Sequence, residues 1–123
     1  MILKYKSTPT VIDGIRFSSK LESKRYEYLK ELEKEHKITN LELQPAFLLQ
    51  PSFRKDGELF RKVEYVADFK YFDVENNKEV IEDVKSYITE KDGLFRIKRK
   101  LFEYKYPNKL TIVNRKGKEW IIK

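Results

Sequence analysis

Two aspartates, Asp68 and Asp83, stand inside apolar runs that are typical of β-strands. A charge in such a position is costly unless it is paired or binds a cation. If the two runs form a hairpin that turns at Asn76-Asn77, Asp68 and Asp83 face each other with a diagonal offset of two residues. The spacing therefore predicts two carboxylates within reach of one shared cation.

This pair is suited to phosphodiester hydrolysis. In proteins Mg²⁺ binds one or two carboxylates and keeps water in its other positions, which leaves room for a phosphate oxygen. Lys85 follows Asp83 by two residues, so the period of a strand places both on one side. An ammonium group there can orient water, help to deprotonate it and offset charge on the phosphate in the transition state. Glu82 competes as the second acid, but the same period places it on the opposite side from Lys85.

A simpler explanation also fits these residues. Asp83 and Lys85 are compatible with a solvent-facing strand whose ion pair contributes about 0 to 1 kcal/mol. Asp-x-Lys is a weak motif on its own, and Asp68 and Lys70 form a second copy of it. The pattern alone leaves both interpretations open.

Glu22 is a third candidate acid, at the start of a predicted helix. In the spacing Ser19-x-x-Glu22, its carboxylate can also close a capping box by accepting from the backbone N–H of Ser19. Spacing alone favours this capping role.

The chain that must position these groups has 123 residues, the length of one domain, 1–123. Lysine and arginine total 27 against 20 acidic residues, and the net charge of +7 favours polyanionic partners. Without cysteine there is no disulfide framework and no thiolate zinc site. The single histidine, His36, is predicted to be exposed at a helix end. No apolar run reaches signal-peptide or membrane-spanning length, so we expect a soluble, cytoplasmic protein without membrane partners.

Turn signals divide the chain into short elements. Hydrophobic periodicity predicts two helices, at 19–37 and 94–104. In the first, Leu21, Tyr28, Leu29 and Leu32 should form the apolar stripe; in the second, Leu94, Ile97, Leu101 and Tyr104 should do so. The predicted strands are a small hairpin (10–12 and 15–17), a meander of three strands (41–53, 61–74 and 79–88) and two final strands (110–113 and 120–122).

These elements predict an α/β (α+β) fold with a mixed central sheet and helices packed on it. The order is helix, three strands, helix, strand. The helix between the third and fourth strands should return the chain parallel to a neighbouring strand. This helix is also strongly basic through Arg96, Lys98, Arg99 and Lys100, which suits contact with a DNA backbone, although an ordinary solvated helix face has the same composition.

A family resemblance rests on five segments that cover nearly the whole chain. They are the run from Asp13 to Tyr26 (DGIRFxSKLExxxY), Leu41 to Pro45 (LELQP), Tyr65 to Phe69 (YVADF), Glu82 to Lys85 (EDVK), and the helix from Phe95 to Pro107. Together they resemble a family of small phage and prophage proteins of the PD-(D/E)XK nuclease superfamily. Relatives in this superfamily include Holliday-junction resolvases and restriction endonucleases.

The resemblance implies a role for each candidate. Asp68 and Asp83 would be metal-ligating carboxylates, Lys85 the signature lysine and Glu22 the helix-borne acid that completes the metal site. Gln44 resembles a recurring polar position of the family. Two residues depart from the usual pattern, since Ala67 rather than proline precedes Asp68 and the second acid is Asp rather than Glu.

The expected function is therefore a Mg²⁺-dependent DNA endonuclease, with Mn²⁺ as a substitute metal, acting on branched or recombination DNA in phage DNA metabolism within a bacterial host cell. The alternative is a non-catalytic DNA-binding protein on the same fold. Symmetric cutting of a junction requires a twofold dimer, so a resolvase-like function implies a homodimer. DNA sequence preference is not readable from these residues.

Overall fold

A computed structural model describes residues 10–86 and 91–123. As predicted, the fold is α+β with a mixed central sheet and helices packed on it. Within the described residues the central sheet has five strands in the order β11-β10-β9-β8-β3, and there are two helices. The helices are α1 (Lys20–Lys34) and α3 (Gly93–Lys105). The strands are β1 (Thr10–Ile12), β2 (Ile15–Phe17), β3 (Ile38–Leu43), β4 (Ala46–Gln50), β5 (Phe53–Lys55), β6 (Glu58–Phe60), β7 (Val63–Val66), β8 (Phe69–Asp73), β9 (Lys78–Val84), β10 (Leu110–Lys116) and β11 (Glu119–Ile122).

The central sheet is mixed because α3 reverses the chain direction. Strand β8 pairs antiparallel with both β3 and β9, whereas β10 runs parallel to β9 after α3. The predicted parallel return is confirmed, and β11 then pairs antiparallel at the edge. The end of the predicted third strand, 87–88, lies outside the described residues.

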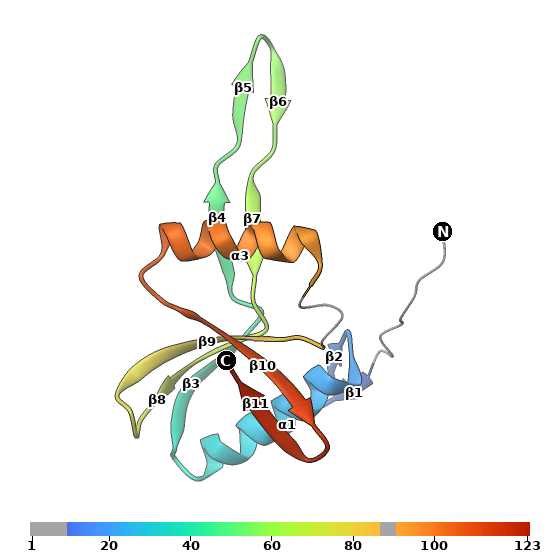
Figure 1. Cartoon of the computed structure of the whole chain (residues 1–123), viewed down its shortest axis with the longest axis vertical. Helices are drawn as coiled ribbons and strands as arrows, with labels where there is room; N and C mark the ends of the chain where they lie inside the picture. The colour runs from blue at the N-terminus through green and yellow to red at the C-terminus, as the bar shows by residue number, and fades with distance from the viewer. Residues whose placement is uncertain (1–9, 87–90) are drawn as a thin grey trace.

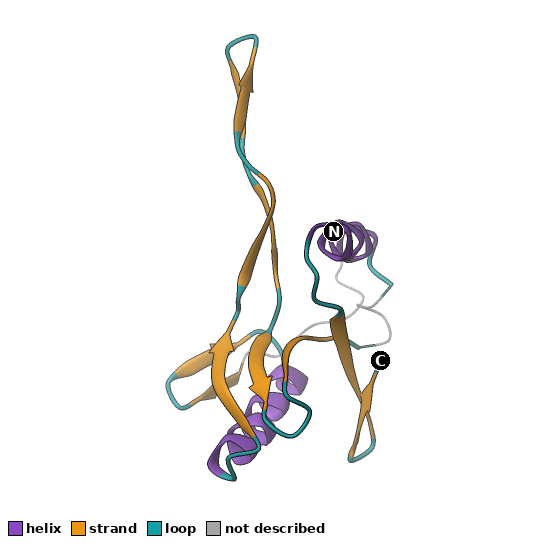
Figure 2. Ribbon diagram, turned by 90° about the vertical axis from the view of Figure 1, so that its left-hand side faces the viewer, coloured by secondary structure: helices purple, strands orange, loops and turns teal. Residues whose placement is uncertain are grey.

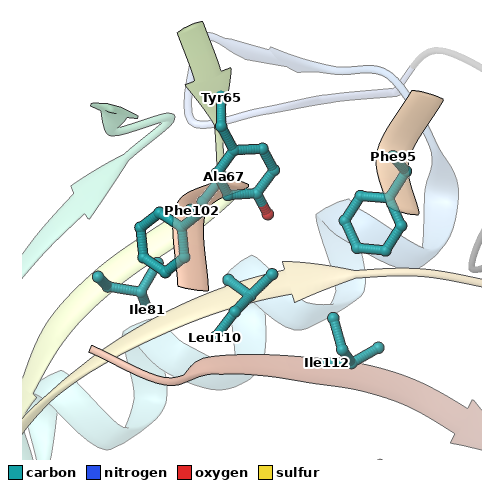
Figure 3. Close-up of a cluster of buried hydrophobic side chains, with 7 residues drawn as sticks. All are labelled: Tyr65, Ala67, Ile81, Phe95, Phe102, Leu110 and Ile112. Carbon is teal, nitrogen blue, oxygen red and sulfur yellow. The ribbon is translucent and has the colours of Figure 1, made fainter. Parts of the chain in front are cut away.

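The two helices cover opposite faces of the sheet. Side chains alternate along β9, so Ile81 packs with α3 while its neighbour Val80 packs with the cluster under α1. The α3 cluster contains Tyr65, Ala67, Ile81, Phe95, Phe102, Leu110 and Ile112 (Figure 3). The α1 cluster contains Phe17, Tyr26, Leu29, Ile38, Phe69 and Tyr71. Each face of β9 therefore has its own core.

The long strands predicted at 41–53 and 61–74 are broken into shorter ones. Gln44 has a positive φ of 53° and Pro45 has no N–H, so the ladder is interrupted between β3 and β4. The pairs β3–β8, β4–β7 and β5–β6 still follow one another along a single interrupted ribbon. Its far end, residues 51–62, projects well beyond the rest of the molecule and is called the arm below (Figures 1 and 2).

Helix α1 is shorter than the predicted 19–37. Ser19 is the N-cap, and its side chain accepts from the backbone N–H of Glu22 at 3.1 Å. The helix ends before His36, which is exposed as predicted and has φ of 60°. Tyr28, predicted to belong to the apolar stripe, is 42% exposed. The buried face of α1 includes Arg25, because an acid on the sheet pairs with it.

The predicted apolar face of α3 is wrong. Leu94, Ile97, Leu101 and Tyr104 are all exposed, and Phe95 and Phe102 face the sheet instead. These two phenylalanines are seven residues apart, which places them on one side of a helix. Phe102 packs against the ring of Tyr65, with ring centroids 5.6 Å apart. Burial of the two phenylalanine rings against the core therefore decides which face of α3 packs on the sheet.

Candidate active site

Asp68 and Asp83 come together where β8 begins and β9 ends. Phe69 pairs with Glu82 across the two strands, so the next residues toward this end, Asp68 and Asp83, lie directly opposite each other. The predicted diagonal offset is therefore wrong by two residues, because the hairpin register is shifted. Asp68 is held by its backbone N–H, which donates to Glu82 O at 3.0 Å, and by its Oδ2, which accepts from Val84 N at 2.7 Å.

The Asp83 carboxylate is buried and unequally satisfied. The Tyr65 hydroxyl donates to its Oδ2. Its Oδ1 is buried, and among the described residues no group forms a hydrogen bond with it. The Nζ of Lys85 lies 3.2 Å from this Oδ1, a charge contact without hydrogen-bond geometry. Buried carboxylate oxygens are normally hydrogen-bonded, so Oδ1 is unusual.

Lys85 is fixed between the carboxylate and an aromatic ring. It follows directly after β9, and its backbone N–H donates to Val113 O at 2.9 Å. The Nζ atom lies 4.5 Å from the centroid of the Phe95 ring on α3. A quarter of the Lys85 side chain remains exposed. The ammonium group is thus positioned by the fold and still reachable from solvent.

Glu22 approaches the two aspartates from the start of α1. Its Oε2 accepts from the Ser18 hydroxyl at 2.9 Å, and no described contact joins its carboxylate to the Ser19 N–H. Half of the predicted capping box is therefore present, with Ser19 as the cap and Glu22 directed elsewhere. Burial raises the pKa of Glu22 against the effect of the Ser18 hydrogen bond, and the charge of Asp83 raises this pKa further.

The pKa of Asp68 lies well above its ordinary value. Burial is the largest cause, and the charges of Asp83 and Glu22 add to it. The hydrogen bond from Val84 and the charge of Lys85 oppose the shift. Burial and neighbouring acidic charges raise the pKa of both Asp68 and Glu22, and such an electrostatic environment favours a bound cation.

Glu82 belongs to the other face, as the period of two predicted. Arg25 donates to it through two hydrogen bonds, Nε to Oε1 at 2.8 Å and Nη2 to Oε2 at 2.6 Å. Tyr71 also donates its hydroxyl to Glu82. Both charged side chains are almost fully buried. Glu82 is therefore fully satisfied by the protein itself.

The donor set fits one divalent cation held mainly by two carboxylates. Among residues 10–86 and 91–123, no three His, Cys, Asp or Glu side chains form a group able to hold a metal ion together. Mg²⁺ needs only one or two protein carboxylates, with water in its other positions. Asp68 and Asp83 supply that minimum, and among the described residues the Asp83 Oδ1 has a charge contact with Lys85 and no hydrogen bond. Glu22, predicted as a third ligand, does not form a three-residue group with them in this described part of the chain.

Three of the four basic residues predicted to bind DNA line a surface depression of about 560 Å³ on α3. Its lining consists of Gly93, Arg96, Ile97, Arg99, Lys100 and Glu103. Arg96 and Lys100 are exposed, whereas Arg99 lies 3.8 Å from Glu103. Lys98, also predicted to bind DNA, is partly buried and does not line the depression.

Gln44 lies beside the site and contacts it through its backbone. Its N–H donates to Asp68 O at 2.9 Å, and the residue is exposed. The residues that sequence reasoning missed are Tyr65 and Phe95, which hold Asp83 and Lys85. Both belong to apolar runs whose pattern indicates core, so no sequence signal separates them from packing residues.

The whole of this site lies within a recognised family. The chain belongs to the family described as Protein of unknown function (DUF1064), whose model matches residues 2–119. Every candidate residue of the DUF1064 chain falls inside that range. Neither the curated proteins nor the solved structures contain a match. No helix in the described part of this DUF1064 protein is both long and apolar enough to cross a bilayer.

Proposed function

We propose that this protein is a Mg²⁺-dependent endonuclease that hydrolyses phosphodiester bonds in DNA, with a core of the PD-(D/E)XK type. One observation carries the proposal. Asp68 and Asp83 face each other across two strands beside Lys85, and a buried oxygen of Asp83 has no hydrogen-bond donor among the described residues. A structural carboxylate would have such a donor, as Glu82 does.

Each residue has a separate task in this proposal. Asp68 and Asp83 would hold Mg²⁺, which supplies charge stabilisation for the phosphate and a more acidic water. Lys85 orients the attacking water and offsets the negative charge that develops on the phosphate oxygens. The water oxygen bonds to phosphorus as the bond from phosphorus to the leaving oxygen breaks, and the leaving oxygen takes up a proton. Glu22 tunes the charge of the two aspartates.

The surroundings favour DNA as the substrate. The net charge of +7 attracts a polyanion, and Arg96 and Lys100 are exposed on α3, whose Phe95 touches Lys85. A phosphate backbone that follows α3 would pass beside the acidic site. Branched DNA, as in recombination intermediates of phage DNA, is the substrate that we propose first, and a homodimer would then cut two strands symmetrically.

The test is direct incubation of the protein with supercoiled plasmid and with a synthetic four-way junction, in Mg²⁺, Mn²⁺ or EDTA. We expect cleavage in either metal, none in EDTA, and loss in Asp83→Ala and Lys85→Ala. Glu75→Gln and Lys78→Ala are matched controls, because both residues are exposed near the β8–β9 turn. If all variants shift intact DNA equally with and without metal, the protein is a non-catalytic DNA-binding protein and the proposal fails.

A further inference from the structure

The arm carries features that the candidate active site does not explain. It is a two-stranded antiparallel ribbon in which Phe53 pairs with Phe60 and Arg54 pairs with Leu59. Every residue of 51–62 is exposed. Both views show it projecting away from the sheet (Figures 1 and 2). An exposed ribbon of this length gains no stability from core packing, so its residues point to contact with another molecule.

The side chains of the arm combine charge with an aromatic pair. It carries four basic residues, Arg54, Lys55, Arg61 and Lys62, against two acidic residues, Asp56 and Glu58. The rings of Phe53 and Phe60 stack with their centroids 4.9 Å apart, although 44% and 38% of these residues are exposed. Within the described residues, Lys55 and Arg61 make no ion pair. Cations beside aromatic surface are typical of nucleic-acid contacts.

The arm is also aligned with the candidate site. Its outgoing strand continues into β7, and Asp68 follows two residues after β7 ends. Helix α3 packs across the base of the ribbon formed by β4 and β7 (Figure 1). Between Phe60 and Asp68 an extended chain spans at most about 26 Å, or about eight base pairs of duplex.

We infer that the arm is a second DNA contact, which lies in the major groove of the duplex that flanks the cleaved phosphate. This inference rests on the proposed function for its substrate. A major groove about 12 Å wide admits a two-stranded β-ribbon. The basic residues of the arm contact phosphates, and the phenylalanine pair contacts the groove. A second copy of the chain is disfavoured as the occupant, because it carries the same positive arm and the same net charge of +7.

DNA binding measured in EDTA tests this inference without cleavage. In one variant, Asn-Gly replaces Pro51–Lys62, a two-residue turn that joins the paired residues Gln50 and Val63. In a second, Lys55→Gln is combined with Arg61→Gln. The control combines Lys116→Gln with Lys118→Gln, which removes the same charge from the exposed β10–β11 turn.

We expect the Lys55/Arg61 variant to bind duplex DNA about tenfold more weakly and to lower the salt slope by about two. The deleted arm has six residues in each strand, about 20 Å, so its removal should reduce the protected footprint by about six base pairs on one side. The control should stay within twofold of the starting protein. Equal affinity, salt slope and footprint in all variants would overturn the inference, as would a change from dimer to monomer in sedimentation when the arm is removed.

The two proposals fail in different ways. If DNA is cleaved normally and the arm variants bind like the starting protein, the arm inference fails and the endonuclease remains. If binding depends on the arm and no substrate is cleaved in any metal, the endonuclease fails and the arm remains a DNA contact.

Discussion

Glu82 and Asp83 are neighbours on β9, and their buried carboxylates differ in how many hydrogen bonds they accept. Glu82 receives two hydrogen bonds from Arg25 and one from Tyr71. Asp83 receives one from Tyr65, and within residues 10–86 and 91–123 its other oxygen has only a charge contact with Lys85. The first arrangement is complete within the chain, whereas the second leaves an oxygen for a ligand. Alternation along β9 thus separates a structural acid from a candidate metal ligand.

The largest expected effect on stability comes from removing Arg25, the ion-pair partner of Glu82. Arg25→Met leaves the Glu82 charge buried without its partner, which should lower the free energy of unfolding by about 3 to 5 kcal/mol. Urea denaturation measures this loss. The double variant Arg25→Met with Glu82→Leu should recover much of it, because it removes the unpaired charge. A loss below about 1 kcal/mol in the single variant would show that the pair is not the main stabiliser of this face.

Asp83→Asn should have the opposite effect from Arg25→Met: it should reduce cleavage without lowering the free energy of unfolding. The amide keeps the shape of the side chain and can still accept from Tyr65, but it removes one of two facing carboxylates. We expect cleavage to fall by about 10² to 10³-fold, with the free energy of unfolding unchanged or higher. Cleavage and urea denaturation are measured on the same variant. The prediction is contradicted if the loss of cleavage is no larger than the loss of folded protein.

Tyr65→Phe and Tyr71→Phe form a matched pair across the sheet. Each removes a hydroxyl that donates to a buried carboxylate, so each should lower the free energy of unfolding by about 1.5 to 3 kcal/mol. Only Tyr65→Phe should also reduce cleavage, by about 10 to 100-fold, because the Tyr65 hydroxyl orients Asp83, a proposed metal ligand. Equal activity in the two folded variants would remove Tyr65 from the site.

The difference between the two acids was partly readable from the sequence. The period of a strand excluded Glu82 as the partner of Lys85, and the turn at Asn76-Asn77 brought Asp68 near Asp83. The direct pairing was missed because the turn spans residues 74–77 and is centred one residue before the predicted position. This shifts the register by two residues, and composition does not fix that shift. The role of Tyr65 was unreadable because a hydrogen-bonding tyrosine and a packing tyrosine occupy the same apolar position.

The α3 face and the arm were missed for a related reason. Two sets of apolar residues follow helical spacing on α3, and only contact with Tyr65 and the sheet decides which set is buried. The arm continues the alternating pattern of β4 and β7, so its sequence resembles a sheet strand. Whether such a strand is covered depends on how far the rest of the sheet extends, which local pattern does not specify.

The smallest expected effect is a pH dependence of the free energy of unfolding that arises from Asp68. The pKa of Asp68 is raised, chiefly by burial and then by Asp83, so the folded protein binds this proton more tightly than the unfolded chain does. In EDTA, stability should therefore fall as pH rises from the ordinary aspartate pKa to the raised one, by at most about 1.4 kcal/mol per pH unit for this group, and then level off.

Asp73 is the control of opposite sign. Hydrogen bonds from Asn76 lower the pKa of Asp73, so its contribution is present above the ordinary pKa and is lost as pH falls through the lowered one. Asp68→Asn should flatten the decline toward neutral pH, and Asp73→Asn should leave it in place. Mg²⁺ should raise stability most at the high-pH end, where it no longer competes with a proton for Asp68. If stability still falls with pH in Asp68→Asn, and Mg²⁺ does not change that fall, then the group with the raised pKa is not one of the paired aspartates.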